Sequence, residues 1–198
     1  MSIPGIIIAV TLHEYIKSLT AYKLGDTNLR NQGRLAFNPL KHMDVLGGIF
    51  MLLFGYGWGN PVRFSPFSFT DRKKGMIIIF VMPFLFNILL GAVFFFAYRL
   101  FLTNIDLFTF FNHQILIIIS GILLRAVIFN ISFAFFNLIP IYPLDGVHLV
   151  SAFAPMFGVK IAQREKVLQI LLAFFIIFGF AERVFGPLVR LILGALIF

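Results

Sequence analysis

The chain has 198 residues, of which 60% are hydrophobic and only 12% are charged. Soluble domains carry about 25% charged residues, so this composition excludes an ordinary soluble domain. The net charge of +8 does not indicate a nucleic-acid partner, because the basic residues fall between apolar runs instead of forming one basic face. The chain contains no cysteine, so a bound metal would need His, Asp or Glu ligands.

We expect an all-α polytopic membrane protein with three to four transmembrane helices, because the apolar runs approach the roughly 20 residues needed to cross a bilayer. The first predicted span runs from Ile3 to about Leu24. The polar stretch that follows predicts a short strand over Arg34–Phe37. Val45–Gly57 is apolar but short and broken by glycine, which favours a re-entrant segment. The stretch "WGNPVRFSP" after it predicts a second short strand and a turn.

Further along the chain, Gly75 to about Leu102 and Gln114 to about Leu138 predict two more spans. The tail from Lys166 to Phe198 is hydrophobic but interrupted by Glu182, Arg183 and Pro187, which favours a helical hairpin. We treat residues 1–198 as one membrane domain, with the core motifs in 1–150 and an extra hydrophobic segment in 166–198.

The distribution of basic residues predicts how the chain is oriented. Seven cations lie between the first two predicted spans, whereas the loop Thr103–His113 has none. The seven are Arg30, Arg34, Lys41, Arg63, Arg72, Lys73 and Lys74. The positive-inside rule therefore places the N-terminus outside and the level of His13 nearer the cytosolic face.

Three ionisable residues interrupt the first predicted span, in the string His13-Glu14-Tyr15-Ile16-Lys17. In a His-Glu-x-x-His helix, two imidazoles one turn apart hold a zinc ion and the Glu takes a proton from the metal-bound water. The first ligand and the base are present here, but Lys17 stands where the second histidine would be. Ionisable groups within a span are costly and therefore indicate function.

A second polar cluster lies in "FNLIPIYPLDG" after the third span. Asp145 precedes a glycine on backbone that prolines keep from forming a regular helix, which suits an oxygen ligand for a metal held by another helix. The sequence therefore predicts that His13 and Asp145 belong to one site although 132 positions separate them.

Four stretches together resemble the site-2 proteases, a family of intramembrane zinc metalloproteases. They are "TLHEYIKSLTAYKLGD", "GRLAFNPLKHMD" with "GYGWGNPV", "MPFLFN", and "NLIPIYPLDG", in the family's order. The resemblance implies a protein that binds and hydrolyses transmembrane segments of other membrane proteins, such as a single-span protein. It also implies that the two short strands pair with an unwound substrate.

Residue by residue, the resemblance implies that His13 and Asp145 are zinc ligands and that Glu14 is the general base. Asn137 matches a residue that donates a hydrogen bond toward the substrate. Asn87 matches the family's Asn, although Val81 and Met82 replace the small residues before Pro83, and Pro140 and Gly146 shape the loop that carries the aspartate.

Lys17 changes this expectation because an ammonium group has three donors and no lone pair, so it repels zinc instead of binding it. We expect Lys17 to bridge Glu14 and Asp145 and to replace the charge of the metal. One zinc ion is then bound weakly or not at all, and catalysis is impaired or lost, which gives a pseudoprotease. Alternatively, His42 or His148 supplies the missing imidazole, or Lys17 extends to the interface as a solvated cation.

Two other function classes stay open at this point. Buried Glu, Lys and Asp side chains also suit a proton relay in a small transporter. The second class is a non-catalytic protein that binds a partner in the membrane. The sequence does not define an oligomeric state.

Overall fold

The computed structural model describes residues 2–105 and 112–197, and all regular secondary structure in these ranges is helical. The helices, in chain order, are α1 (Ile3–Lys23), α2 (Asn28–Asn31), α3 (Pro39–His42), α4 (Val45–Phe54), the 3-10 helix η1 (Pro66–Ser68), α5 (Arg72–Thr103), α6 (His113–Phe136), α7 (Gly146–Phe153), α8 (Pro155–Ala162), α9 (Glu165–Ile177) and α10 (Phe180–Ile197). The predicted all-α class is confirmed for this part of the chain.

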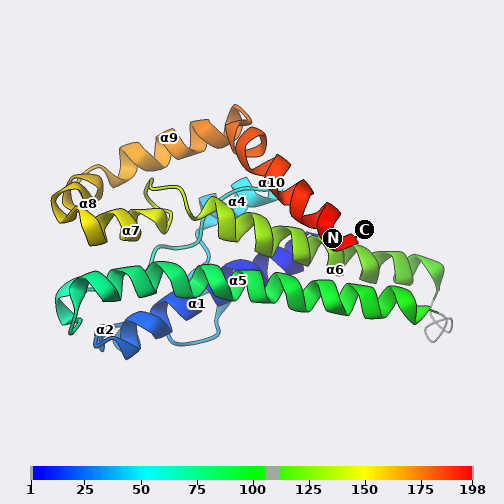
Figure 1. Ribbon diagram of the computed structural model, residues 1–198, viewed down its shortest axis with the longest axis horizontal. Coiled ribbons are helices and arrows are strands. Elements are labelled where there is room, and N and C mark those ends of the chain that lie inside the picture. The colour runs from blue at the N-terminus through cyan, green and yellow to red at the C-terminus, as the bar shows by residue number, and fades with distance from the viewer. Residues whose placement is uncertain (1, 106–111, 198) are drawn as a thin grey trace.

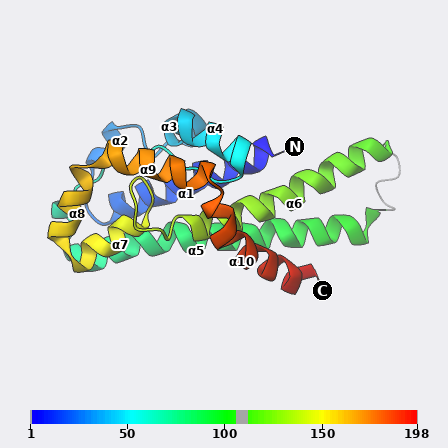
Figure 2. The same ribbon diagram turned by 90° about the horizontal axis from the view of Figure 1, so that it is seen from above.

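Helices α5 and α6 run side by side along the longest axis of the molecule, and α1 packs obliquely against both (Figures 1 and 2). Helix α1 buries one face, which carries Ile6, Val10, His13 and Lys17 at the spacing of successive helical turns. The backbones of α1 and α6 approach closely at Gly5, where a Cβ atom would lie 3.1 Å from Cα of Ala126. The polar residues of α1 therefore point into the bundle.

Helices α5 and α6 are long and apolar enough to cross a membrane, and α9 with α10 adds a third span if the bent pair counts as one. The prediction of three to four spans is therefore confirmed only for two or three. Helix α1 is 21 residues long but does not belong to this set, because its buried polar side chains lower its mean hydropathy. Most of the predicted loop between α5 and α6, residues 106–111, lies outside the described residues.

The two predicted strands are wrong. Among the described residues, backbone pairing of the β type is limited to one bridge between Met43 and Gly59. The guanidinium of Arg34 explains the difference, because it donates to the carbonyl oxygens of Lys41, Asn60 and Pro61 at 2.7, 3.0 and 3.1 Å. These loops are thus joined through a side chain instead of a ladder of backbone bonds.

The segment predicted to be re-entrant, Val45–Gly57, forms helix α4 and a short extended continuation, and the structure does not support a re-entrant path. Asp44 caps the start of α4 by accepting a hydrogen bond from the N–H of Gly47 at 2.8 Å. The same carboxylate accepts from the indole N–H of Trp58 at 3.1 Å. Gly55 ends the helix with a φ of 80°, a left-handed conformation that favours glycine.

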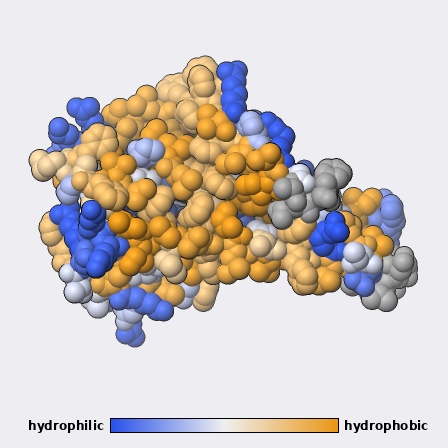
Figure 3. Space-filling model, in the orientation of Figure 1, coloured by the Kyte–Doolittle hydropathy of each residue, from blue (hydrophilic) through white to orange (hydrophobic). Residues whose placement is uncertain are grey.

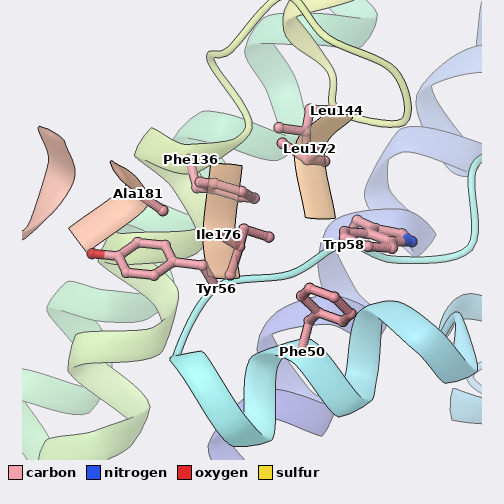
Figure 4. Close-up of a cluster of buried hydrophobic side chains, with 8 residues drawn as sticks. All are labelled: Phe50, Tyr56, Trp58, Phe136, Leu144, Leu172, Ile176 and Ala181. Atoms are coloured by element: carbon pink, nitrogen blue, oxygen red, sulfur yellow. The ribbon is translucent and has the colours of Figure 1, made fainter. Parts of the chain in front are cut away.

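The C-terminal segment is also different from the predicted hairpin. Helices α9 and α10 meet at a bend of 64° instead of folding back antiparallel. They are attached to the rest of the molecule by a cluster of buried side chains from α4, the loop after it, α6, the α6–α7 connection, α9 and α10 (Figure 4). Its members are Phe50, Tyr56, Trp58, Phe136, Leu144, Leu172, Ile176 and Ala181.

Helix α5 begins three residues before the predicted span because Asp71 caps it. The Asp71 carboxylate accepts a hydrogen bond from the N–H of Lys74 at 3.0 Å, and this bond lowers the pKa of the Asp71 side chain. Arg72, Lys73 and Lys74 then form the first, charged turn of the helix, ahead of its apolar part.

We predict that Arg34→Met lowers the free energy of unfolding by about 3 kcal/mol, because three carbonyl oxygens lose their charged donor. Equilibrium unfolding in detergent measures the change. The matched control is Arg30→Met, on the exposed surface of α2, for which we expect a change within about 0.5 kcal/mol. Equal losses in the two variants would contradict the bracing role of Arg34.

Candidate functional site

The predicted site residues come together where α1 meets α5 and the connection between α6 and α7. His13, Glu14 and Lys17 point inward from α1. Asp145, the residue directly before α7, contacts His13 and Lys17. All four side chains are almost completely buried, with 2% or less of each residue exposed. The structure therefore brings Glu14 and Asp145 into one buried cluster, as the sequence analysis expects, although the roles of these residues stay a prediction.

Lys17 lies between the two carboxylates. Its Nζ atom is 2.9 Å from each carboxylate oxygen of Glu14 and 2.5 Å from Oδ1 of Asp145. Only 1% of the residue is exposed, so the alternative in which Lys17 extends to the interface as a solvated cation is wrong. The three donors of the ammonium group therefore serve two buried acids that would otherwise lack a counter-charge.

His13 completes the cluster from the other side of Asp145. Its Nε2 atom is 2.8 Å from Oδ2 of Asp145, and its Nδ1 atom is 3.0 Å from Oδ1 of Asn87 on α5. Since an ionised carboxylate only accepts hydrogen bonds, the Nε2–H group of His13 donates a hydrogen bond to Asp145. His13 is thus held by hydrogen-bond contacts at both ring nitrogens, one to α5 and one to the residue before α7.

Asn87 connects this cluster to the neighbouring helices. Its amide nitrogen lies 3.5 Å from the carbonyl oxygen of Ala9 and 3.5 Å from Oδ1 of Asn130 on α6. Asn130 is fully buried and donates to the carbonyl oxygen of Ala126 at 2.8 Å. The sequence analysis did not identify Asn130. An asparagine within an otherwise apolar stretch of α6, on the same helix face as Ala126 and Phe133, could have indicated it.

Asn137 and Gly146 shape the loop that presents Asp145. The side chain of Asn137 donates to the carbonyl oxygen of Phe133 at 2.8 Å, and its own carbonyl oxygen accepts from the N–H of Gly146 at 2.8 Å. A Cβ atom on Gly146 would collide with the carbonyl oxygen of Leu138. Pro140 lies exposed in the middle of this loop. Asn137 thus braces the loop, and its role toward a substrate stays a prediction.

Gly59 also belongs to the site, and sequence reasoning did not single it out. A Cβ atom at this position would lie 2.7 Å from Oε1 of Glu14, so only glycine lets the loop approach the carboxylate this closely. The signal in the sequence is the glycine pattern of "GYGWGNP", but its partner on α1 depends on the tertiary fold.

The two histidines considered as substitute ligands have different neighbours. His148 Nε2 is 3.9 Å from Oδ1 of Asp145, and its ring packs against that of Phe64 with centroids 4.9 Å apart. His42 is buried, and its Nε2 atom lies 2.8 Å from the carbonyl oxygen of Ala36 in its own loop. His148 thus lies beside Asp145, whereas the ring of His42 binds the backbone of the loop before α3.

The residues present do not fit a zinc site. Protein-bound zinc takes about four ligands with free lone pairs, from imidazole, carboxylate or thiolate groups. Within residues 2–105 and 112–197, no three His, Asp or Glu side chains form a group that could hold a metal ion. The ammonium group of Lys17 instead occupies the point where the Glu14 and Asp145 carboxylates converge. Its positive charge disfavours a second cation at that point.

We predict that Lys17→Met destabilises the protein by about 3–5 kcal/mol, because it leaves buried carboxylates without their cation. The matched control is Lys74→Met, since Lys74 forms an ion pair with Asp71 at 3.6 Å but its side chain is 79% exposed. The control should change stability by less than about 1 kcal/mol. Equilibrium unfolding in detergent compares the two, and a loss no larger than that of the control would contradict a charge cluster held by Lys17.

Comparison with known proteins gives one family relation. No family model matches the chain, and no solved structure shows a significant match. A protein of Bacillus subtilis (strain 168) named "Putative zinc metalloprotease YwhC" is 31% identical over 161 residues, which cover 76% of this chain and 67% of that relative. The chain belongs to the same zinc metalloprotease family as this Bacillus protein.

Proposed function

We propose that this protein is an intramembrane member of its family, of the site-2 type, in which Lys17 replaces the charge of the zinc ion. It binds a transmembrane segment of another membrane protein without hydrolysing it. The observation that carries the proposal is the position of Lys17 Nζ, within 2.9 Å of both carboxylate oxygens of Glu14 and 2.5 Å of Asp145.

Electrostatics supports the replacement of the metal. A zinc ion would compensate the charge of the buried acids, and so does an ammonium group that donates hydrogen bonds to Glu14 and forms an ion pair with Asp145. Removing the metal without such a substitute would leave buried carboxylates unpaired, which costs several kcal/mol. Lys17 thus allows the fold of the family to persist without its Lewis acid.

The loss of hydrolysis follows from the same contacts. A general base must have a carboxylate oxygen free to take a proton from water. Both oxygens of Glu14 accept hydrogen bonds from Lys17, and Gly59 covers the same carboxylate. Glu14 therefore neutralises a cation in this chain instead of activating water.

The membrane setting is supported by the two helices long and apolar enough to span a bilayer, α5 and α6. We place α1 in the membrane beside them, because it packs against both along its length and turns its polar side chains inward. The N-terminus lies outside in this proposal, and the level of the cluster is nearer the cytosolic face, as the distribution of basic residues predicts.

The zinc content of the detergent-purified protein tests the proposal. We expect little zinc in the wild type and about one equivalent in Lys17→His, which restores the second imidazole one turn from His13. Lys17→Gln is the matched control, because it removes the cation without supplying a ligand for zinc, and it should bind little metal.

The same preparations, incubated with a single-span membrane protein, should yield the intact partner and no fragments from the wild type. Near-stoichiometric zinc in the wild type would overturn the replacement of the metal. Cleavage that depends on Glu14 would overturn the loss of hydrolysis.

A further inference from the structure

A cavity of about 380 Å³ lies beside the charge cluster, between the loop before η1, the first turns of α5, and helices α7 and α8. Its walls are mainly apolar and include Val62, Met76, Leu144, Val147 and Ile161. Ligand pockets in proteins typically measure about 300–1,000 Å³ and combine apolar walls with a few polar groups. This cavity has the size and character of a binding site.

Two arginines give the cavity an excess of positive charge. Arg63 and Arg72 both line it and are exposed at the surface, and neither forms an ion pair with any residue in the described ranges. Lys17 also lines the cavity, but Glu14 and Asp145 already neutralise it. Glu165 contributes one acid to the wall. The uncompensated charge suits an anionic group on the ligand.

Two exposed phenylalanine rings, each with a basic side chain over it, lie near the cavity. Phe67 is 84% exposed and Phe153 64% exposed, and each has a cation over its ring. The guanidinium of Arg72 lies 5.0 Å from the Phe67 centroid, and Nζ of Lys73 lies 4.5 Å from that of Phe153. Long basic side chains that lie over apolar rings suit the boundary between a bilayer and water, because the stem stays on apolar surface while the charge reaches the headgroups.

The position of the cavity in the fold also places it at the boundary between the bilayer and water. Helix α5 is long enough to cross a membrane and begins at Arg72, so the cavity lies at one end of a span. Hydrophilic side chains gather at the same end of the molecule in Figure 3, at the left, where α8 lies in Figure 1, beside a largely apolar surface. The headgroups of the adjacent leaflet are the anions nearest to such a site.

We propose that this cavity binds one anionic phospholipid, with its phosphate on Arg63 and Arg72 and part of an acyl chain against the apolar walls. The chemistry that the site recognises is a phosphate attached to an alkyl chain. The site depends on the two arginines and the cavity walls, so it is separate from the replacement of zinc by Lys17.

Native mass spectrometry of the full chain in detergent, after lipid removal, tests the proposal. The probes are phosphatidylglycerol, phosphatidylcholine with the same acyl chains, and inorganic phosphate. We expect one phosphatidylglycerol to bind, and the variant with both Arg63→Gln and Arg72→Gln to bind it at least about tenfold more weakly, since each cation near an anionic headgroup contributes several-fold.

A matched control is Arg183→Gln, because Arg183 is also exposed and lies 5.6 Å from the centroid of the Phe180 ring, but it does not line the cavity. It should leave the affinity unchanged. Ala162→Trp, at an exposed position of the cavity wall, adds bulk to the cavity and should weaken phosphatidylglycerol binding while the chain still folds.

Three outcomes would overturn the proposal. Equal affinity for the two phospholipids would remove the role of the negative charge, and an equal loss in Arg183→Gln would make the attraction nonspecific. Inorganic phosphate that binds with the same affinity as phosphatidylglycerol would show that the acyl chain has no part in recognition.

Discussion

The pairing of one buried ammonium group with two buried carboxylates is the constraint on which the rest of this structure depends. Lys17, Glu14 and Asp145 are each 2% exposed or less, and two different parts of the chain supply them. Burying a charge is tolerable only when a partner and hydrogen bonds compensate it. The contact therefore joins α1 to the α6–α7 connection and fixes the residues that surround it.

Several features of the fold follow from this requirement. Asp145 reaches α1 because Asn137 and Gly146 close a tight loop at the end of α6, and a side chain at Gly146 would block that loop. Gly59 allows another loop to approach the Glu14 carboxylate closely. Asn87 and Asn130 satisfy polar groups at the junction of α1, α5 and α6. In a family of zinc proteins, such a shell would normally position metal ligands.

The sequence predicts the helices and the centre of the site well, because both depend on simple physical rules. The apolar runs that become α5 and α6 are visible directly, and ionisable residues within a span require partners, which leads from Lys17 to Glu14 and Asp145. The two predicted strands are wrong because the residues around Arg34 do not reveal that its guanidinium donates to three backbone carbonyl groups. Gly59 and Asn130 were missed for a similar reason, since their partners are determined only by tertiary packing.

We expect the stabilities contributed by Lys17 and Asp145 to be strongly coupled, because the burial of each charge is tolerated only in the presence of the other. A double-mutant cycle of Lys17→Met and Asp145→Asn, followed by equilibrium unfolding in detergent, measures this coupling most directly. We expect the double variant to be more stable than the sum of the single losses by about 2 kcal/mol. Single losses that add to within about 0.5 kcal/mol would contradict the claim that the lysine is the counter-ion of this site.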